Sequence, residues 1–117
     1  MIGPSQQSRV HLALGVTDMR KSINGLSILV ADLLEEDPFS GHIFAFCNRR
    51  RNMVKVLYWD RNGFCLWCKR LEKERFSWPT EKGDVKKVDL RQFFWLLDGL
   101  SIEQEKAHKK LSYSVVF

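Results

Sequence analysis

The chain has 117 residues, of which 44% are hydrophobic and 28% charged, with a formal net charge of +5 at pH 7. This predicts one soluble domain spanning residues 1–117, with a compact core over about 9–99 and a tail over 100–117. The highly charged residues 101–110 are expected to form a third helix with Ser101 as its cap. For the apolar, β-prone residues 111–117 two interpretations stay open, a strand at a sheet edge and a disordered end. No apolar run approaches the roughly 20 residues that span a bilayer, and no secretory signal pattern is present. We therefore expect no membrane contact and a cytoplasmic location.

The first elements expected along the chain are a strand and an amphipathic helix. Apolar side chains alternate along residues 9–15, which predicts a short strand. Thr17 or Asp18 has the side-chain oxygen of a helix N-cap, so the helix is expected to begin there and to run to about residue 35. The Asp37-Pro38 step ends it, because the residue before a proline disfavours helical geometry. The predicted buried stripe consists of Met19, Ile23, Leu26, Val30 and Leu33.

Three runs rich in aromatic and β-branched residues then predict an antiparallel meander over residues 42–47, 53–60 and 64–71. The turn Asp60–Gly63 contains Asn-Gly, which reverses a chain within a few residues because both types tolerate left-handed geometry. The other turn, residues 48–52, contains three consecutive arginines. We expect them to point into solvent, because burial of unpaired charge is costly. Two interpretations stay open, a solvated loop and a phosphate contact.

Alternation along these runs places large apolar groups on both sides of the sheet near Asp60–Gly63, and cations further away. We therefore expect helices to cover one face and an aromatic, basic second face to remain open. Trp59 and Trp67 are expected to share that surface, with a core or subunit-interface role as the alternative. The fold class is α+β: an antiparallel meander sheet of about four to five strands, packed by an N-terminal helix and a later helix.

The later helix has strong local signals at both ends. Asp89 and Gln92 form a capping box at its start, and Gly99 provides a left-handed stop at its end. Before this helix, residues 75–79 are expected to extend the sheet as an edge segment. Residues 85–88 are expected to form a short strand or an extended lead-in.

The three cysteines do not indicate a metal site. An odd count without a secretory signal favours free thiols. The spacing Cys65-x-x-Cys68 places the two sulfurs on opposite sides of a strand, and a second ligand pair is missing, so no zinc site is expected. We expect the cysteines to be small core residues.

Catalytic chemistry is not indicated either. The histidines at positions 11, 42 and 108 are expected to lie far apart, and no phosphate-binding glycine loop or nucleophile motif is present. Asp18, Asp60 and Asp84 are explained as cap, turn and loop residues rather than as a metal-binding triad. The sequence therefore predicts a protein that is not an enzyme, with no cofactor and no small-molecule substrate.

Five segments together resemble the TnpB-type, second-frame accessory protein of the insertion-sequence family numbered sixty-six. The resemblance covers about Val10 to Gly99. The segments are Thr17–Leu26, Asp37–Phe46, Val54–Phe64, Lys69–Glu72 and Arg75–Pro79. It implies a mobile-element protein that works beside a separate, larger transposase carrying the catalytic carboxylates. The family offers no catalytic residues to carry over.

Charge distribution and resemblance together suggest a DNA-binding accessory factor for transposition. Residues 49–87 contain twelve Lys and Arg against five Asp and Glu, and such a basic region favours nucleic acid. The predicted phosphate contacts are Arg49, Arg50, Arg51, Lys55, Lys69 and Arg70, with Arg20 and Lys21 at the helix start. Expected partners are the transposon ends and the transposase. The alternative is a protein–protein adaptor that docks the transposase or self-associates as a homodimer without touching DNA.

Overall fold

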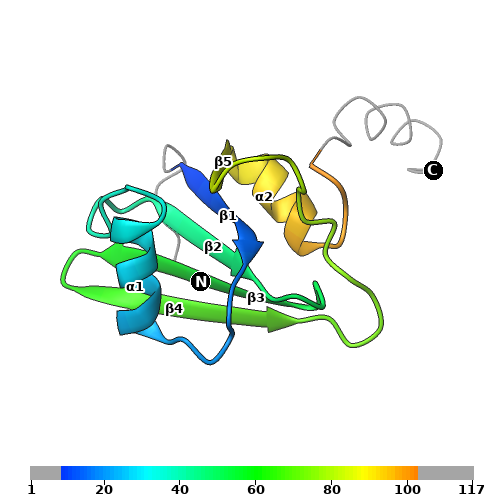
Figure 1. Ribbon diagram of the computed structural model, residues 1–117, viewed down its shortest axis with the longest axis horizontal. Coiled ribbons are helices and arrows are strands. Elements are labelled where there is room, and N and C mark those ends of the chain that lie inside the picture. The colour runs from blue at the N-terminus through cyan, green and yellow to red at the C-terminus, as the bar shows by residue number, and fades with distance from the viewer. Residues whose placement is uncertain (1–8, 103–117) are drawn as a thin grey trace.

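The computed structural model describes residues 9–102 and contains, over that range, five strands and two helices. In chain order they are β1 (Val10–Val16), α1 (Ile23–Asp32), β2 (Ile43–Cys47), β3 (Met53–Asp60), β4 (Gly63–Arg70), β5 (Val85–Val88) and α2 (Leu90–Leu97). The strands form one sheet in the order β4-β3-β2-β1-β5 (Figure 1). The predicted α+β class is confirmed.

The predicted meander is formed by β2, β3 and β4. Asp60 pairs with Gly63 across the tight turn, and Cys47 pairs with Val54 at the other end of the sheet. β1 lies parallel to β2, and β5 pairs antiparallel with β1. Parallel neighbours need a crossover connection, which α1 supplies here.

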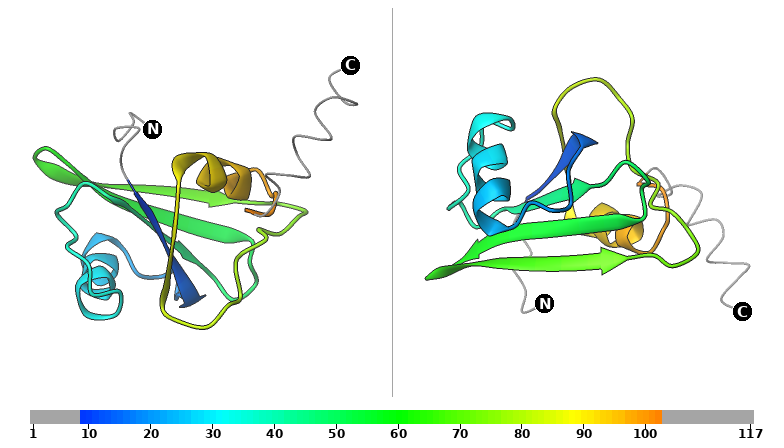
Figure 2. Two further views of the ribbon diagram at one scale, coloured as in Figure 1. Left: turned by 90° about the horizontal axis from the view of Figure 1, so that it is seen from above. Right: turned by 60° about the horizontal axis from the view of Figure 1, so that its bottom comes forward.

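Each face of the sheet is covered by one helix (Figure 2, left). The cluster on the α1 side consists of Ala13, Leu26, Val30, Leu34, Phe44, Phe46 and Leu57. On the other side, α2 and the segment that precedes β5 bury Phe76, Trp78, Phe93, Leu96 and Leu97 against the strands. The indole N–H of Trp78 donates a 2.8 Å hydrogen bond to the carbonyl oxygen of Ala13, which fixes this segment to the sheet.

The expectation of one open sheet face is therefore wrong. The face that carries Val54, Val56 and Tyr58 is apolar and buried, and it obtains its cover from α2 and from Phe76 and Trp78. Residues 75–79 supply this cover as an irregular segment and not as the predicted edge strand. Burial of the aromatic side chains outweighs strand pairing in that segment.

α1 begins five residues later than Asp18, one of the two predicted caps. The Asp18 carboxylate accepts hydrogen bonds from Arg20 instead of capping a helix, and Ser22 occupies the N-cap position without a side-chain bond. At the other end Leu34 is buried, whereas Leu33 is 47% exposed. The predicted buried stripe is therefore correct for Leu26 and Val30, correct in part for the half-buried Met19 and Ile23, and wrong for Leu33.

α2 begins and ends where its capping signals in the sequence predict. The Asp89 carboxylate accepts a 2.7 Å hydrogen bond from the backbone N–H of Gln92, and the Gln92 side chain accepts one from Asp89. Gly99 has φ 86°, in the left-handed region that ends a helix. The strand alternative for residues 85–88 is confirmed as β5. The predicted third helix and the apolar C-terminal segment fall mainly or wholly outside the described residues.

Candidate nucleic-acid interface

The turn between β2 and β3 is organised by one side chain. Oδ1 of Asn48 accepts hydrogen bonds of 3.1 Å from the backbone N–H groups of Asn52 and Met53, and its amide donates to Asn52 Oδ1 at 2.7 Å. These bonds hold the loop in a fixed shape and leave Arg49 and Arg50 exposed at its tip. Over residues 9–102, no carboxylate lies within ion-pair distance of either arginine.

Arg51 behaves differently from its two neighbours, and the expectation that all three point into solvent is wrong for it. Its φ is 60°, it is only partly exposed, and its Nη1 atom is buried with no hydrogen-bond partner among the described residues. Its carbonyl oxygen accepts a 2.7 Å hydrogen bond from the N–H of Phe76. Burial raises the pKa of the nearby Cys47 thiol, and the Arg51 guanidinium partly opposes that rise. Arg51 therefore joins the turn to the segment after β4.

That segment brings two further cations beside the turn, together with two carboxylates, those of Glu72 and Glu74. Leu71 donates to the carbonyl oxygen of Asn52, and Phe76 donates to that of Arg51. Between these two anchors lie the exposed side chains of Lys73 and Arg75. The site prediction omitted both, although the charge run Lys73-Glu74-Arg75 directly after a strand is a signal for them.

The loop between β1 and α1 lies next to the same region. Thr17 donates a 2.9 Å hydrogen bond to the carbonyl oxygen of Cys47. Further along, the Lys55 ammonium donates to the carbonyl oxygen of Lys21 at 2.8 Å. Lys21 itself is exposed. The structure thus brings Arg20, Lys21 and Lys55 together on the α1 side of the sheet.

Arg20 is paired within this loop. Its guanidinium donates to both Asp18 oxygens, the shortest bond being 2.7 Å, and its backbone N–H adds a bond of 2.9 Å. These hydrogen bonds from Arg20 hold the pKa of Asp18 down at about 2. Since both groups lie in solvent, the pair orders the loop without removing charge from water.

Lys69 and Arg70, at the end of β4, are also engaged. Lys69 donates a 2.8 Å hydrogen bond to the carbonyl oxygen of Leu97 at the C-terminus of α2, on the face opposite Lys55. Arg70 forms a two-bond pair with Glu72, at 2.8 and 3.2 Å. We call the end of the sheet that carries these two residues together with Arg49 and Arg50 the basic end.

The two tryptophans do not share a surface, which corrects the expectation. Trp59 lies opposite Phe64 on the α1 face, while Trp67 lies opposite Val56 on the α2 face. Trp59, Phe64 and Phe39 form an edge-packed aromatic cluster with ring centroids 5.0 to 5.3 Å apart. This cluster adjoins the Asp60–Gly63 turn, at the far end from Arg49 and Arg50. Base stacking beside the arginine turn is therefore not supported by these two rings.

A histidine pair was missed because β1 and β2 were not expected to be neighbours. His11, which is buried, and His42 share a 3.0 Å hydrogen bond between Nε2 and Nδ1. Nδ1 of His11 faces Glu36 at 3.8 Å. Burial lowers the pKa of His11, and the Glu36 carboxylate opposes the shift. The expectation that these histidines lie far apart is wrong, and His108 is outside the described residues.

The cysteines show the predicted alternation, but only some of them lie in the core. Cys65 lies opposite Tyr58 and Cys68 opposite Lys55, so their side chains point to opposite faces as expected. Cys47 is buried, whereas Cys68 is exposed and is not a core residue. Within residues 9–102, no three His, Cys, Asp or Glu side chains are grouped so that they could hold a metal ion.

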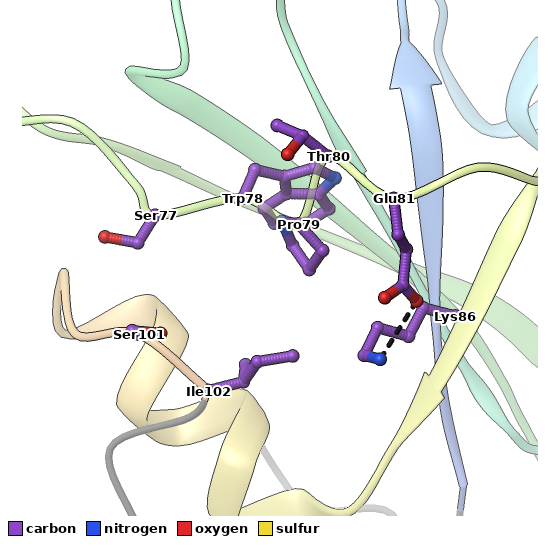
Figure 3. A pocket seen from close by; sticks show the side chains of 8 residues that line it. All are labelled: Ser77, Trp78, Pro79, Thr80, Glu81, Lys86, Ser101 and Ile102. Carbon is purple, nitrogen blue, oxygen red and sulfur yellow. Dashed lines mark hydrogen bonds and ion pairs between the residues drawn. The ribbon is translucent and has the colours of Figure 1, made fainter. Parts of the chain in front are cut away.

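One hollow of about 310 Å³ lies between the segment before β5 and the end of α2. Figure 3 shows Trp78, Pro79 and Ile102 around it, with Glu81 and Lys86 joined by an ion pair of 2.9 Å. The charges of this pair offset each other, so the hollow offers no strong electrostatic attraction to a ligand. Neither of the two described helices is both long enough and apolar enough to cross a membrane.

Comparison with known proteins identifies the family. Residues 8–107 match the family described as IS66 Orf2 like protein. Two proteins of Sinorhizobium fredii (strain NBRC 101917 / NGR234), the uncharacterized proteins y4hO and y4jC, are 36% and 37% identical to this chain over 100 residues. The alignments cover 86% of this chain in both cases, and 87% and 86% of the two relatives. No solved structure matches. The chain therefore belongs to the IS66 Orf2-like family, whose members have an accessory role in insertion-sequence transposition.

Proposed function

We propose that this protein serves transposition by binding DNA phosphates through its basic end, without carrying out chemistry itself. The observation that carries the proposal is the pair Arg49 and Arg50. Both are exposed, and neither is neutralised by a carboxylate within the described residues. An exposed arginine presents a fork of donors that matches phosphate oxygens.

The geometry of the turn supports the proposal because it fixes the backbone that carries the two arginines. Asn48 ties the loop to Asn52 and Met53, and Arg51 ties it to Phe76. A preorganised loop loses less conformational entropy on binding than a flexible one. The exposed Lys21 adds positive charge near this tip, whereas the charges of Lys73 and Arg75 are matched in their own segment by the exposed Glu72 and Glu74.

The remaining predicted contacts are expected to contribute less. Lys55 and Lys69 are already bonded to backbone carbonyl oxygens, and Arg20 and Arg70 are paired with Asp18 and Glu72. To contact a phosphate, Arg20 would have to break its ion pair with Asp18 or divide its N–H donors between the carboxylate and the phosphate. The same holds for Arg70 and Glu72. We therefore rank the turn above the strands as the phosphate-binding element.

The test is a binding titration of the pure protein with transposon-end and random duplexes at several salt concentrations. The double variant Arg49→Ala/Arg50→Ala is compared with Arg9→Ala/Arg61→Ala, which removes the same charge from exposed positions at the opposite end of the sheet. Loss of two phosphate contacts lowers the slope of log affinity against log salt by about 2. The proposal fails if both double variants lose affinity equally or if neither does.

The adaptor function remains a second candidate because apolar side chains are exposed on the outer faces of both helices. Ile28 on α1 is 58% exposed, and Phe94 on α2 is 49% exposed. A docking surface of this kind binds a protein partner with little dependence on salt. Capture of the element's transposase that persists in high salt and is lost in Ile28→Glu or Phe94→Glu would support this candidate.

A further inference from the structure

The two edges of the sheet differ in how they are protected. β5 is an edge strand of four residues, and two of them are Lys86 and Lys87. Short edges and lysines are the usual means by which proteins prevent strands from pairing with another chain. β4, at the other edge, has eight residues and carries no charge or proline from Gly63 to Cys68. Its register with β3 is continuous, with no bulge.

The outward hydrogen-bonding groups of β4 can be identified from its pairing with β3. Leu71 donates to the carbonyl oxygen of Asn52, and the register places these two residues opposite each other. Residues in an antiparallel pair bond to the partner at every second position. The odd-numbered residues of β4 therefore bond to β3, and the backbone groups of Phe64, Leu66, Cys68 and Arg70 point away from the sheet.

Within residues 9–102, no other strand pairs with this edge. In Figure 1 and in the right view of Figure 2, β4 forms the free lower border of the sheet. An uncapped strand of this length is a template for addition of another strand.

We propose that β4 is a dimerisation edge, which pairs antiparallel with β4 of a second copy about a twofold axis. In one register, every outward backbone N–H and C=O group from Phe64 to Arg70 finds a hydrogen-bond partner on the other strand. It places Phe64 opposite Arg70 of the partner copy, and Leu66 opposite Cys68. Trp67 then lies opposite its own counterpart at the axis.

Side-chain chemistry favours a second copy in this register. No like charges face each other across Phe64–Arg70, because only Lys69 and Arg70 are charged and both would lie opposite uncharged residues. The Arg70 guanidinium would lie beside the ring of Phe64, which belongs to the aromatic cluster with Phe39 and Trp59. A cation beside an aromatic face adds favourable energy. The two basic ends would lie at opposite ends of the joined sheet.

Amide hydrogen exchange tests the edge directly. Mass measurement by light scattering, with a reductant present, is expected to give a dimer whose population rises with protein concentration. The amides of Phe64, Leu66, Cys68 and Arg70 are then expected to exchange at least about tenfold more slowly in the dimer than in the monomer. The amides of Cys65 and Trp67 bond to β3 and provide the internal reference. A protein that stays monomeric, or a dimer in which the four outward amides exchange as fast as in the monomer, overturns the proposal.

Two variants at Cys68 test one backbone hydrogen bond across the proposed dimer edge, and neither of them removes a buried side chain. Cys68 is exposed and its N–H points outward, so Cys68→Pro is compatible with the edge and deletes one bond to the partner copy. Cys68→Ser keeps the N–H and serves as the control. The expected result is a folded monomer for Cys68→Pro, by circular dichroism and mass, and an unchanged dimer for Cys68→Ser. Equal dimerisation of two folded variants contradicts edge pairing.

The register has its own test, which remains informative if the proline variant fails to fold. Opposed residues of a non-hydrogen-bonded antiparallel pair have Cα atoms about 4.5 Å apart, within reach of a disulfide. With Cys65 and Cys68 replaced by Ser, Trp67→Cys is expected to form an intermolecular disulfide under mild oxidation, whereas Leu71→Cys is not. A cross-link at 71 and not at 67 overturns the proposed register and the dimer built on it.

Discussion

The ammonium of Lys69 on β4 donates a hydrogen bond of 2.8 Å to the carbonyl oxygen of Leu97, the last residue of α2. This bond satisfies a helix-end carbonyl and places a positive charge at the negative end of the helix dipole. Lys69→Met should therefore lower the free energy of unfolding by about 1 to 2 kcal/mol. Urea denaturation measures this, with the exposed Lys73→Met as the control. Equal stability of the two variants would show that the bond contributes nothing.

Asn48 provides the second stability test, because its side chain supplies three of the hydrogen bonds of the arginine turn. Asn48→Ala should lower the free energy of unfolding by about 1 to 3 kcal/mol. It should also weaken DNA binding, because the backbone that carries Arg49 and Arg50 would no longer be held in one geometry. Asn62→Ala in the opposite turn is the control, because its exposed side chain makes no hydrogen bond within residues 9–102. A stable Asn48→Ala with unchanged DNA affinity would contradict the role assigned to this side chain.

The parts of the fold that could be predicted are those whose signals lie close together in the chain. The capping box of Asp89 and Gln92 spans one helical turn, and the stop at Gly99 acts through its own φ of 86°. The Asp60–Gly63 turn is also local, but its left-handed residue is Arg61, with φ 50°, and not Asn62 or Gly63 as the Asn-Gly signal predicted. The start of α1 is also local, but there two local interactions compete, and the Asp18 carboxylate bonds to Arg20 instead of capping a helix.

Long-range pairing could not be predicted in the same way. Val10 lies beside Ile43 because α1 crosses over the sheet, and no sequence feature of either strand indicates that the two strands pair. The pair of His11 and His42 depends on this crossover and was therefore missed. The faces on which the two tryptophans lie could have been predicted from the sequence. Once Asp60 is paired with Gly63, simple counting puts Trp59 opposite Phe64 and on the other face from Trp67.

The Asp18–Arg20 pair predicts a defined response to acid. Hydrogen bonds from Arg20 lower the folded-state pKa of Asp18 from 3.8 to about 2. A lowered carboxyl pKa gives stability that is present above the unfolded value and is lost as pH falls from about 4 towards 2. An NMR titration of the Asp18 carboxyl should give a midpoint near 2, which should return towards 3.8 in Arg20→Ala.

The control for this titration is Lys21→Ala, because Lys21 has only a weak effect on Asp18 and its loss should leave the midpoint near 2. A midpoint that moves as far in Lys21→Ala as in Arg20→Ala would show that general positive charge, rather than the hydrogen bonds, sets this pKa.

His11 predicts a second pH dependence, at higher pH and with its own cause. Burial lowers its pKa below 6.5, with opposing attraction from Glu36 and further lowering from His42, Lys87 and Arg9. The unfolded chain therefore takes up the proton first, so the free energy of unfolding should fall as pH drops below about 6.5. The slope for one proton cannot exceed about 1.4 kcal/mol per pH unit.

The matching variant is His11→Phe. In the native protein the rings of His11 and Phe44 are stacked with their centroids 4.9 Å apart, and a phenyl ring at position 11 keeps this stacking. Because the phenyl ring cannot titrate, its unfolding free energy should change less between pH 7 and 5, even if the variant is less stable throughout. Urea denaturation at each pH measures both proteins. If the slopes are the same, the buried imidazole is not the group that senses acid, and the loss of stability must be assigned to other titrating residues.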